Sequence, residues 1–144
     1  MEKILYSFEY EACFSGKLAI FCSDERFITA NLAFLENYLK IERSDLMVLP
    51  GGPEFIINDE SNLLERLGIL VKAHQIKQII LISHSDCGYY KKSFDNFSKE
   101  KILKKQLDDT KKAINRLKNL FDGTSVYSFH AFISDPGIIK YTQI

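Results

Sequence analysis

The sequence lacks several features that would assign it at once to a large class of proteins. Its 19 basic and 19 acidic residues cancel, which argues against a chain built to grip nucleic acid or an anionic membrane. No stretch is long and apolar enough to span a bilayer. The first residues, MEKILYSFEYEACF, have no basic segment followed by an apolar one, so they do not resemble a signal peptide. We therefore expect a cytoplasmic protein with no nucleic-acid or membrane partner.

Cysteine is scarce, and its count is odd. The chain has Cys13, Cys22 and Cys87, which argues against a disulfide framework. In a reducing compartment a cysteine packs in the core, binds a metal or acts as a nucleophile. Cys13 belongs to no motif and is read as a packing residue. There is no C-x-x-C, and Cys22 to Arg26 is too short for a phosphate-cradling cysteine loop, so a metal-free thiol enzyme is the least favoured hypothesis.

The chain also lacks internal repeats, low-complexity tracts and linkers. Its 144 residues, 46% of them hydrophobic, indicate one domain over residues 1–144 with enough apolar material for a core. Apolar or alternating runs predict strands over residues 17–22, 46–49, 77–83 and 124–133. Capping residues and apolar stripes predict helices from Thr29 to about Lys40, from Asn58 or Asp59 to about Ala73, and from Ser98 to about Phe121. Residues 4–14 are either an edge strand or an arm.

Alternating strands and helices are typical of an α/β fold with a mainly parallel sheet. Numbered along the chain, the strands are expected in the order 2-1-3-4, flanked by helices and joined by right-handed crossovers. In such sheets, sites form beyond the carboxyl ends of the strands where the strand order reverses. The ends of the first and third strands would then be neighbours at one crevice.

Residues that can bind a metal ion lie at the ends of those two strands. His84 and Cys87 are three residues apart on one turn, so both side chains can point at one ion, and Cys22 at the end of the first strand would be the third ligand. Two thiolates and one imidazole suit zinc better than magnesium or calcium. Three protein ligands leave a fourth position, which is typical of a catalytic site and can hold water or a carboxylate.

Asp24 and Arg26 follow Cys22 closely. Two thiolates formally cancel the charge of zinc, so the metal acidifies its water less than an all-histidine site does. Such a site benefits from an acceptor that orients the water or hydroxide, and Asp24 is well placed by sequence. Arg26 can hold Asp24 ionised through a bidentate pair. Asp24 and Asp86 both compete for the fourth position, and the Asp24–Arg26 pair alternatively braces a turn.

The two motifs, C-x-D-x-R from residue 22 and H-x-x-C-G from residue 84, together resemble the signature of the β-class carbonic anhydrases. The resemblance covers roughly residues 17–90. It implies a β-carbonic anhydrase-like fold and a zinc lyase, a carbonate dehydratase that reversibly hydrates carbon dioxide to bicarbonate through zinc-bound hydroxide. It also implies a homodimer or a higher homo-oligomer.

The resemblance also implies roles for individual residues. Cys22, His84 and Cys87 would bind Zn²⁺, and Asp24 and Arg26 would form a catalytic dyad. In some members of the family the aspartate instead coordinates zinc, so Asp24 is a possible fourth ligand.

The sequence departs from the family at the loop after the second strand. Residues 49–53 read Leu-Pro-Gly-Gly-Pro where the family usually carries an Ala-Gly-Asn-like loop, although the glycines suit a close backbone approach. The chain is also short for the family. Two alternatives to carbon dioxide hydration follow. One is a catalytically weak zinc-binding protein, and the other is a hydrolase of carbonyl sulfide or carbon disulfide.

Overall fold

A computed structural model of the chain describes residues 1–58 and 62–144. In this part of the chain one five-stranded sheet has the order β2-β1-β3-β4-β5. The strands are β1 (Lys17–Phe21), β2 (Asp45–Val48), β3 (Gln78–His84), β4 (Ser125–Ser134) and β5 (Ile138–Gln143). The first four run parallel, and β5 is antiparallel to β4. The mainly parallel α/β sheet in the order 2-1-3-4 is confirmed, and β5 extends it by one strand that the sequence analysis did not predict.

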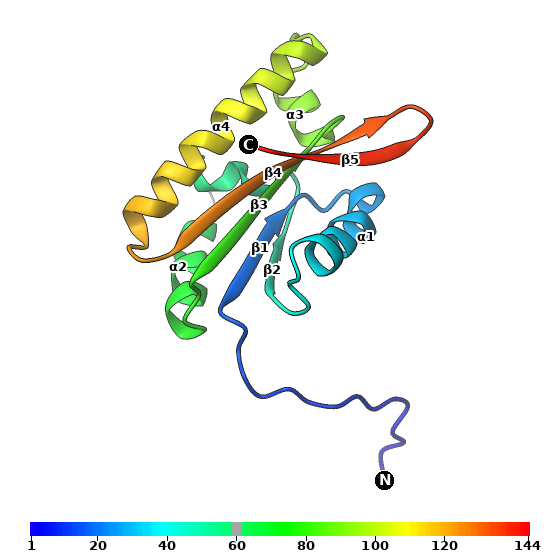
Figure 1. The fold of residues 1–144 in the computed structure, drawn as a ribbon, viewed down its shortest axis with the longest axis vertical. Helices are drawn as coiled ribbons and strands as arrows, with labels where there is room; N and C mark the ends of the chain where they lie inside the picture. The colour runs from blue at the N-terminus through cyan, green and yellow to red at the C-terminus, as the bar shows by residue number, and fades with distance from the viewer. Residues whose placement is uncertain (59–61) are drawn as a thin grey trace.

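Helices cover both faces of the sheet (Figure 1). They are α1 (Glu25–Ala33), continued by a π-helix (Phe34–Tyr38), a 3-10 helix (Gly52–Ile56), α2 (Leu63–Ala73), α3 (Gly88–Ser93) and α4 (Lys99–Leu120). Figure 1 shows α2 and α4 on one side of the sheet and α1 on the other. Within the described residues, no helix combines the length and the apolar character needed to cross a membrane.

The central strands β1 and β3 are buried on both faces, as is usual for parallel strands between helical layers. Leu18 and Ile20 of β1 pack in one apolar cluster with residues of α2, α4 and the 3-10 helix. Ala19 and Phe21 pack in a second cluster with Phe27 of α1. Burial on both faces fixes the height and rotation of each strand, and therefore the position of the residues that follow it.

The helix after β1 begins earlier than predicted. The sequence analysis starts it at Thr29, whereas α1 begins at Glu25 with Asp24 as its N-cap. Oδ1 of Asp24 accepts a hydrogen bond from the backbone N–H of Arg26 at 3.0 Å, which satisfies one of the free amides of the first turn. The prediction was wrong because Asp24 was read for its chemistry and not as a cap.

The next helix begins later than predicted. α2 starts at Leu63, with Asn62 as its N-cap. Asn58 instead follows the 3-10 helix, and its side chain donates to Oε1 of Glu54 at 2.6 Å. Asp59, the other predicted start, lies outside the described residues. The prediction that Ser98 caps a helix ending near Phe121 is confirmed, because Oγ of Ser98 accepts from the N–H of Lys101 at 3.2 Å.

The N-terminal segment is an arm and not a strand. Residues 1–14 make no strand pairing and extend away from the sheet (Figure 1). Two contacts hold its base. The carbonyl oxygen of Cys13 accepts from Nη1 of Arg43 at 2.9 Å, and the ring of Phe14 stacks on that of His74 with centroids 3.9 Å apart.

Candidate metal centre

Cys22, His84 and Cys87 come together at the carboxyl ends of β1 and β3. Cys22 follows β1, His84 is the last residue of β3, and Cys87 precedes α3. One ligand atom from each residue lies within 4.8 Å of the others, and all three residues are buried. The two sulfur atoms are 4.0 Å apart. The three side chains therefore lie together where they were expected, at the edge of the sheet where the strand order reverses.

His84 presents one ring nitrogen to this cluster. Its Nδ1 lies 2.7 Å from the carbonyl oxygen of Ser85 and acts as the donor, because a carbonyl can only accept. The ring of Phe27 packs against the imidazole with centroids 4.2 Å apart. Nε2 is buried and has no hydrogen-bond partner among the described residues. Such an atom is costly to bury unless a ligand satisfies it, so Nε2 fits the role of a metal ligand.

The spacing of the donor atoms fits a tetrahedral ion. Bonds of about 2.3 Å to sulfur and about 2.0 Å to nitrogen put the ligand atoms roughly 3.5–3.8 Å apart. The distances between the donor atoms of Cys22, His84 and Cys87, at most 4.8 Å, need to shorten only slightly to match. The soft set of two sulfurs and one imidazole favours zinc over magnesium or calcium. Three protein ligands leave room for a fourth.

The two thiols share their protons unequally. The hydrogen bond with Cys87 lowers the pKa of Cys22. The pKa of Cys87 is raised because of its hydrogen bond with Cys22 and because the thiol is buried. Burial opposes this shift, and the side chain of His84, followed by the backbone amides of Asp24 and Gly51, lowers the pKa of Cys22 further. Because its pKa is raised, the thiol of Cys87 would have to give up its proton in order to bind a metal.

The Pro-Gly-Gly-Pro loop packs directly behind Cys22. A Cβ atom on Gly52 would lie 2.9 Å from the backbone nitrogen of Cys22, and one on Gly51 would lie 2.6 Å from the ring of Tyr89. Both glycines have positive φ, +84° and +55° in chain order, a conformation that side chains disfavour. The expected close backbone approach is therefore present, although the loop lacks the asparagine that is usual in the family.

Asp24 and Arg26 form a two-pronged ion pair beside the cluster. Nη2 of Arg26 donates to Oδ2 of Asp24 at 2.6 Å, and Nε donates to Oδ1 at 3.0 Å. These hydrogen bonds lower the pKa of Asp24 to about 2, so the carboxylate stays ionised at every physiological pH. Both carboxylate oxygens of Asp24 accept hydrogen bonds from Arg26, and Asp24 is also the N-cap of α1.

Arg26 also holds a second carboxylate. Its Nη1 donates to Oδ2 of Asp86 at 3.0 Å, and Lys91 donates to Oδ1 of Asp86 at 2.8 Å. Lys91 first, and then Arg26, lowers the pKa of Asp86. The sequence analysis considered Asp86 as a competitor for the fourth metal position, but its two oxygens are bonded to these cations. Asp86 therefore fixes the guanidinium that holds Asp24.

Three residues around the cluster were missed by sequence reasoning. Nε2 of Gln106 donates to the backbone carbonyl of His84 at 3.0 Å. The hydroxyl of Tyr90 donates to Oδ2 of Asp109 at 3.0 Å. Gln106 and Asp109 are polar residues at buried positions of α4. That interruption of the apolar stripe is the one signal in the sequence that could have identified them.

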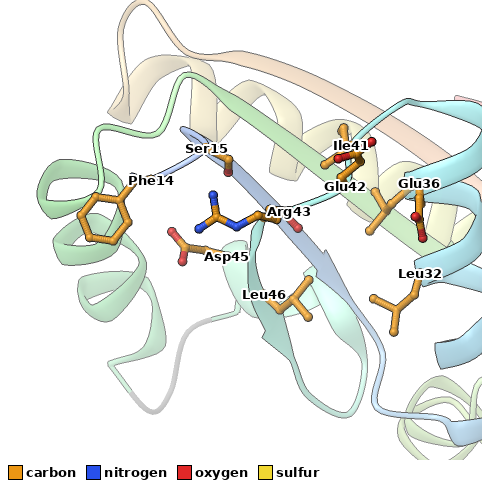
Figure 2. A pocket seen from close by; sticks show the side chains of 11 residues that line it. Phe14, Ser15, Leu32, Glu36, Ile41, Glu42, Arg43, Asp45 and Leu46 are labelled. Atoms are coloured by element: carbon orange, nitrogen blue, oxygen red, sulfur yellow. The ribbon is translucent and has the colours of Figure 1, made fainter. Parts of the chain in front are cut away.

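A pocket of about 460 Å³ lies where β1 and β2 begin (Figure 2). It is formed by the base of the N-terminal arm, the α1 region and the start of β2, including Phe14, Leu32, Arg43 and Asp45. Cys22, His84 and Cys87 do not line it. Because β1 and β2 begin there, the pocket is at the opposite end of the sheet from the cluster.

Comparison with known proteins places the chain in a family. The profile of the family described as "Putative carbonic anhydrase" matches residues 12–139. The chain therefore belongs to this family, and the resemblance to β-class carbonic anhydrases is confirmed. Uncharacterised proteins of Rickettsia bellii and Rickettsia conorii are each 29% identical over 123 residues. These alignments cover 80% of this chain, 75% of the first relative and 66% of the second.

Solved β-carbonic anhydrases share the fold. Isoform I from Trichomonas vaginalis has a TM-score of 0.56 at 14% identity, covering 94% of this chain and 86% of that one. Wild-type CafD from Aspergillus fumigatus has a TM-score of 0.56 at 12% identity, covering 89% of this chain and 88% of that one. One of two tetrameric β-carbonic anhydrases from Sordaria macrospora has a TM-score of 0.53 at 17% identity, covering 90% of this chain and 81% of that one.

We expect Gly52→Ala to disturb the cluster more than an equivalent change elsewhere. The added Cβ strains a positive φ and meets the backbone of Cys22, so the free energy of unfolding should fall by about 1–3 kcal/mol or more, and zinc affinity should fall with it. Gly123→Ala is the matched control, because Gly123 also has positive φ but a Cβ there meets nothing within 4 Å. Denaturant unfolding and a chelator competition measure the two effects. Equal zinc affinity in both variants would contradict the role assigned to the loop.

Zinc binding should release protons and weaken on acidification. The raised pKa of Cys87 means that its thiol is protonated at neutral pH and must lose the proton to bind. Zinc affinity should therefore fall about tenfold per pH unit for each proton displaced. Titration of the metal-free protein in weak buffer with a pH indicator measures the release. An affinity that is constant between pH 6 and pH 8 would be inconsistent with this proton balance.

Proposed function

We propose that this chain is a zinc-dependent carbonate dehydratase that reversibly hydrates carbon dioxide to bicarbonate. Cys22, His84 and Cys87 hold Zn²⁺ in a single α/β domain over residues 1–144. The observation that carries the proposal is Nε2 of His84, buried without a partner among the described residues and grouped with two thiols. Membership of the carbonic anhydrase family supports the choice of reaction.

Asp24 and Arg26 are the catalytic pair in this proposal. When bound, zinc lowers the pKa of a water molecule and so supplies a nucleophile near neutral pH. The ionised carboxylate of Asp24 would accept a hydrogen bond from the attacking water or hydroxide and orient it toward carbon dioxide. Arg26 keeps the carboxylate ionised and fixed in direction. Its hold on both oxygens of Asp24 favours an acceptor role for Asp24 over the alternative role of fourth zinc ligand.

Asp24→Asn should abolish hydration and leave the metal in place. An amide keeps the size of the side chain but loses the charge and one acceptor, so we expect kcat to fall by about 10²–10⁴-fold. Stopped-flow hydration of carbon dioxide, with zinc content measured on the same sample, tests this. Glu25→Gln is the control, because Glu25 is an exposed acidic neighbour on the first turn of α1. If Asp24→Asn retained full activity with full zinc, Asp24 would have no part in catalysis.

The same measurement separates the alternative functions. A wild-type protein that holds zinc but does not hydrate carbon dioxide at any pH would exclude the dehydratase. Turnover of carbonyl sulfide or carbon disulfide would then assign a related hydrolase. If no turnover occurred, and chelation lowered the melting temperature, the chain would be a zinc-binding protein with a structural or regulatory role.

We further propose that the chain works in the cytoplasm as a homodimer or a higher homo-oligomer. Its three cysteines are free, as suits a reducing compartment, and a similar solved structure is described as tetrameric. The N-terminal arm exposes Ile4, Leu5, Tyr6, Phe8 and Tyr10, each at 81–88% of its surface. So many large apolar side chains on one segment are typical of a surface that another chain covers.

We expect Phe8→Asp to shift the protein toward the monomer. Ile4, Tyr6, Phe8 and Tyr10 alternate with other residues, so they share one side of an extended chain, and a charge on that side should disrupt its contact. Ser7→Asp adds the same charge on the other side and serves as the control. Light scattering coupled to size exclusion measures the mass. A monomeric wild type, or equal behaviour of the two variants, would refute the role of this side of the arm.

A further inference from the structure

We infer that Gln106 of α4 and the Tyr90–Asp109 pair are positioning elements of the metal centre. They hold the segment that carries His84 and Cys87 in the geometry that the ion requires. This inference rests on the proposed zinc site, but it does not depend on which reaction the site performs.

Gln106 acts on the backbone of a metal ligand. Its side chain is buried, and Nε2 donates to the carbonyl oxygen of His84 at 3.0 Å. Nδ1 of His84 donates to the carbonyl of the next residue, Ser85, at 2.7 Å. The peptide carbonyls on both sides of Ser85 are therefore engaged, which fixes the backbone and the tautomer of His84 together. Such outer contacts set the direction of a metal-bound imidazole.

Tyr90 connects the second ligand to the same helix. Its ring packs with Cys22 and Cys87 in a small buried cluster. Its hydroxyl donates to Oδ2 of Asp109 at 3.0 Å, and Lys105 pairs with the other oxygen of Asp109. The carboxylate of Asp109 is buried and fully engaged, so it fixes the ring that lies against both thiols.

These contacts come from one side of α4. Ile102, Gln106 and Asp109 are spaced four and three residues apart, so they lie on one helical face. Ile102 packs against the cluster that contains both thiols and Tyr90. Toward the other end of the helix, Ala113 and Leu117 fill an ordinary apolar core. Gln106 and Asp109 are therefore the buried polar residues of α4 that bond to the segment carrying His84, Cys87 and Tyr90.

Stability alone does not account for these polar residues. A buried hydrogen bond adds little net stability, and apolar residues of the same shape often serve as well. What apolar residues cannot supply is direction, because their packing tolerates small rotations of the groups they touch. A hydrogen bond to the carbonyl of His84 and another through Tyr90 restrict the rotations that would separate the ligand atoms.

The test compares isosteric variants of the full-length protein. Gln106→Met removes the donor to His84 and keeps the chain length, and Tyr90→Phe removes the hydroxyl and keeps the ring. Thr110→Val is the matched control, because Thr110 is also buried on α4, but its hydroxyl donates to the backbone carbonyl of Gln106 at 2.8 Å, within the helix. Zinc affinity is measured by chelator competition. The absorption bands of bound Co²⁺ report the geometry of the site, and denaturant unfolding of the metal-free forms reports stability.

We expect Gln106→Met and Tyr90→Phe each to weaken zinc binding about 10–100-fold and to alter the cobalt spectrum. Thr110→Val should lower the free energy of unfolding by a comparable amount without weakening zinc binding or altering the cobalt spectrum. Wild-type affinity and spectrum in both test variants would overturn the inference. So would a loss of affinity that follows stability equally in all three variants.

The outcomes also separate this inference from the proposed function. If the wild-type protein binds zinc but does not hydrate carbon dioxide, the proposed reaction is excluded and the positioning role is unaffected. If the wild-type protein binds neither zinc nor Co²⁺, both the proposed metal centre and this inference are excluded. If Gln106→Met does not fold, Tyr90→Phe alone decides, because it keeps the apolar ring that packs on the thiols.

Discussion

β1 and β3 lie side by side in parallel at the centre of the sheet, and the metal centre depends on this pairing. The register places Phe21 opposite Ile82, so Cys22 and His84 follow that pair by one and two residues. Because neighbouring side chains alternate between faces, a shift of one residue would turn His84 to the other face of the sheet. Burial of both strands on both faces prevents such a shift, so the apolar core determines the geometry of the site.

The site concentrates negative charge, and its cations are arranged to offset it. The thiol of Cys22, whose pKa is lowered, and the carboxylates of Asp24 and Asp86 all lie just beyond the carboxyl ends of β1 and β3. Arg26 bridges the two carboxylates, and Lys91 pairs with Asp86. Arg26 and Lys91 are half exposed, so these pairs add little to stability. Their effect is on direction, because Arg26 bonds to both oxygens of Asp24 and keeps this carboxylate ionised and fixed in orientation.

The sequence predicted the parts of the fold and site that depend on local pattern. Apolar runs located β1 and β3, and the two short motifs located the three residues of the cluster. The prediction placed the start of α1 too late because Asp24 caps the helix while it also pairs with Arg26. Gln106 and Asp109 could not be assigned because their partners, His84 and Tyr90, are 22 and 19 residues away, and spacing along a helix says nothing about such contacts. β5 was missed because its pattern is short and mostly exposed.

The candidate metal cluster lies beside the two main cores and contacts the second one through Phe27, whose ring packs on His84. Cys22, Cys87 and Tyr90 form their own small group, whereas the larger clusters lie beneath α2 and α4 on one face and α1 on the other. Most of the buried apolar side chains of the described residues therefore lie outside the small group of Cys22, Cys87 and Tyr90. Within the part of the chain that the structure describes, Nε2 of His84 is buried without a hydrogen-bond partner, which is a local cost that a bound ion would remove. A metal ion would thus bind at a site that the fold has already assembled, and the contacts from α4 would limit how far that site must move.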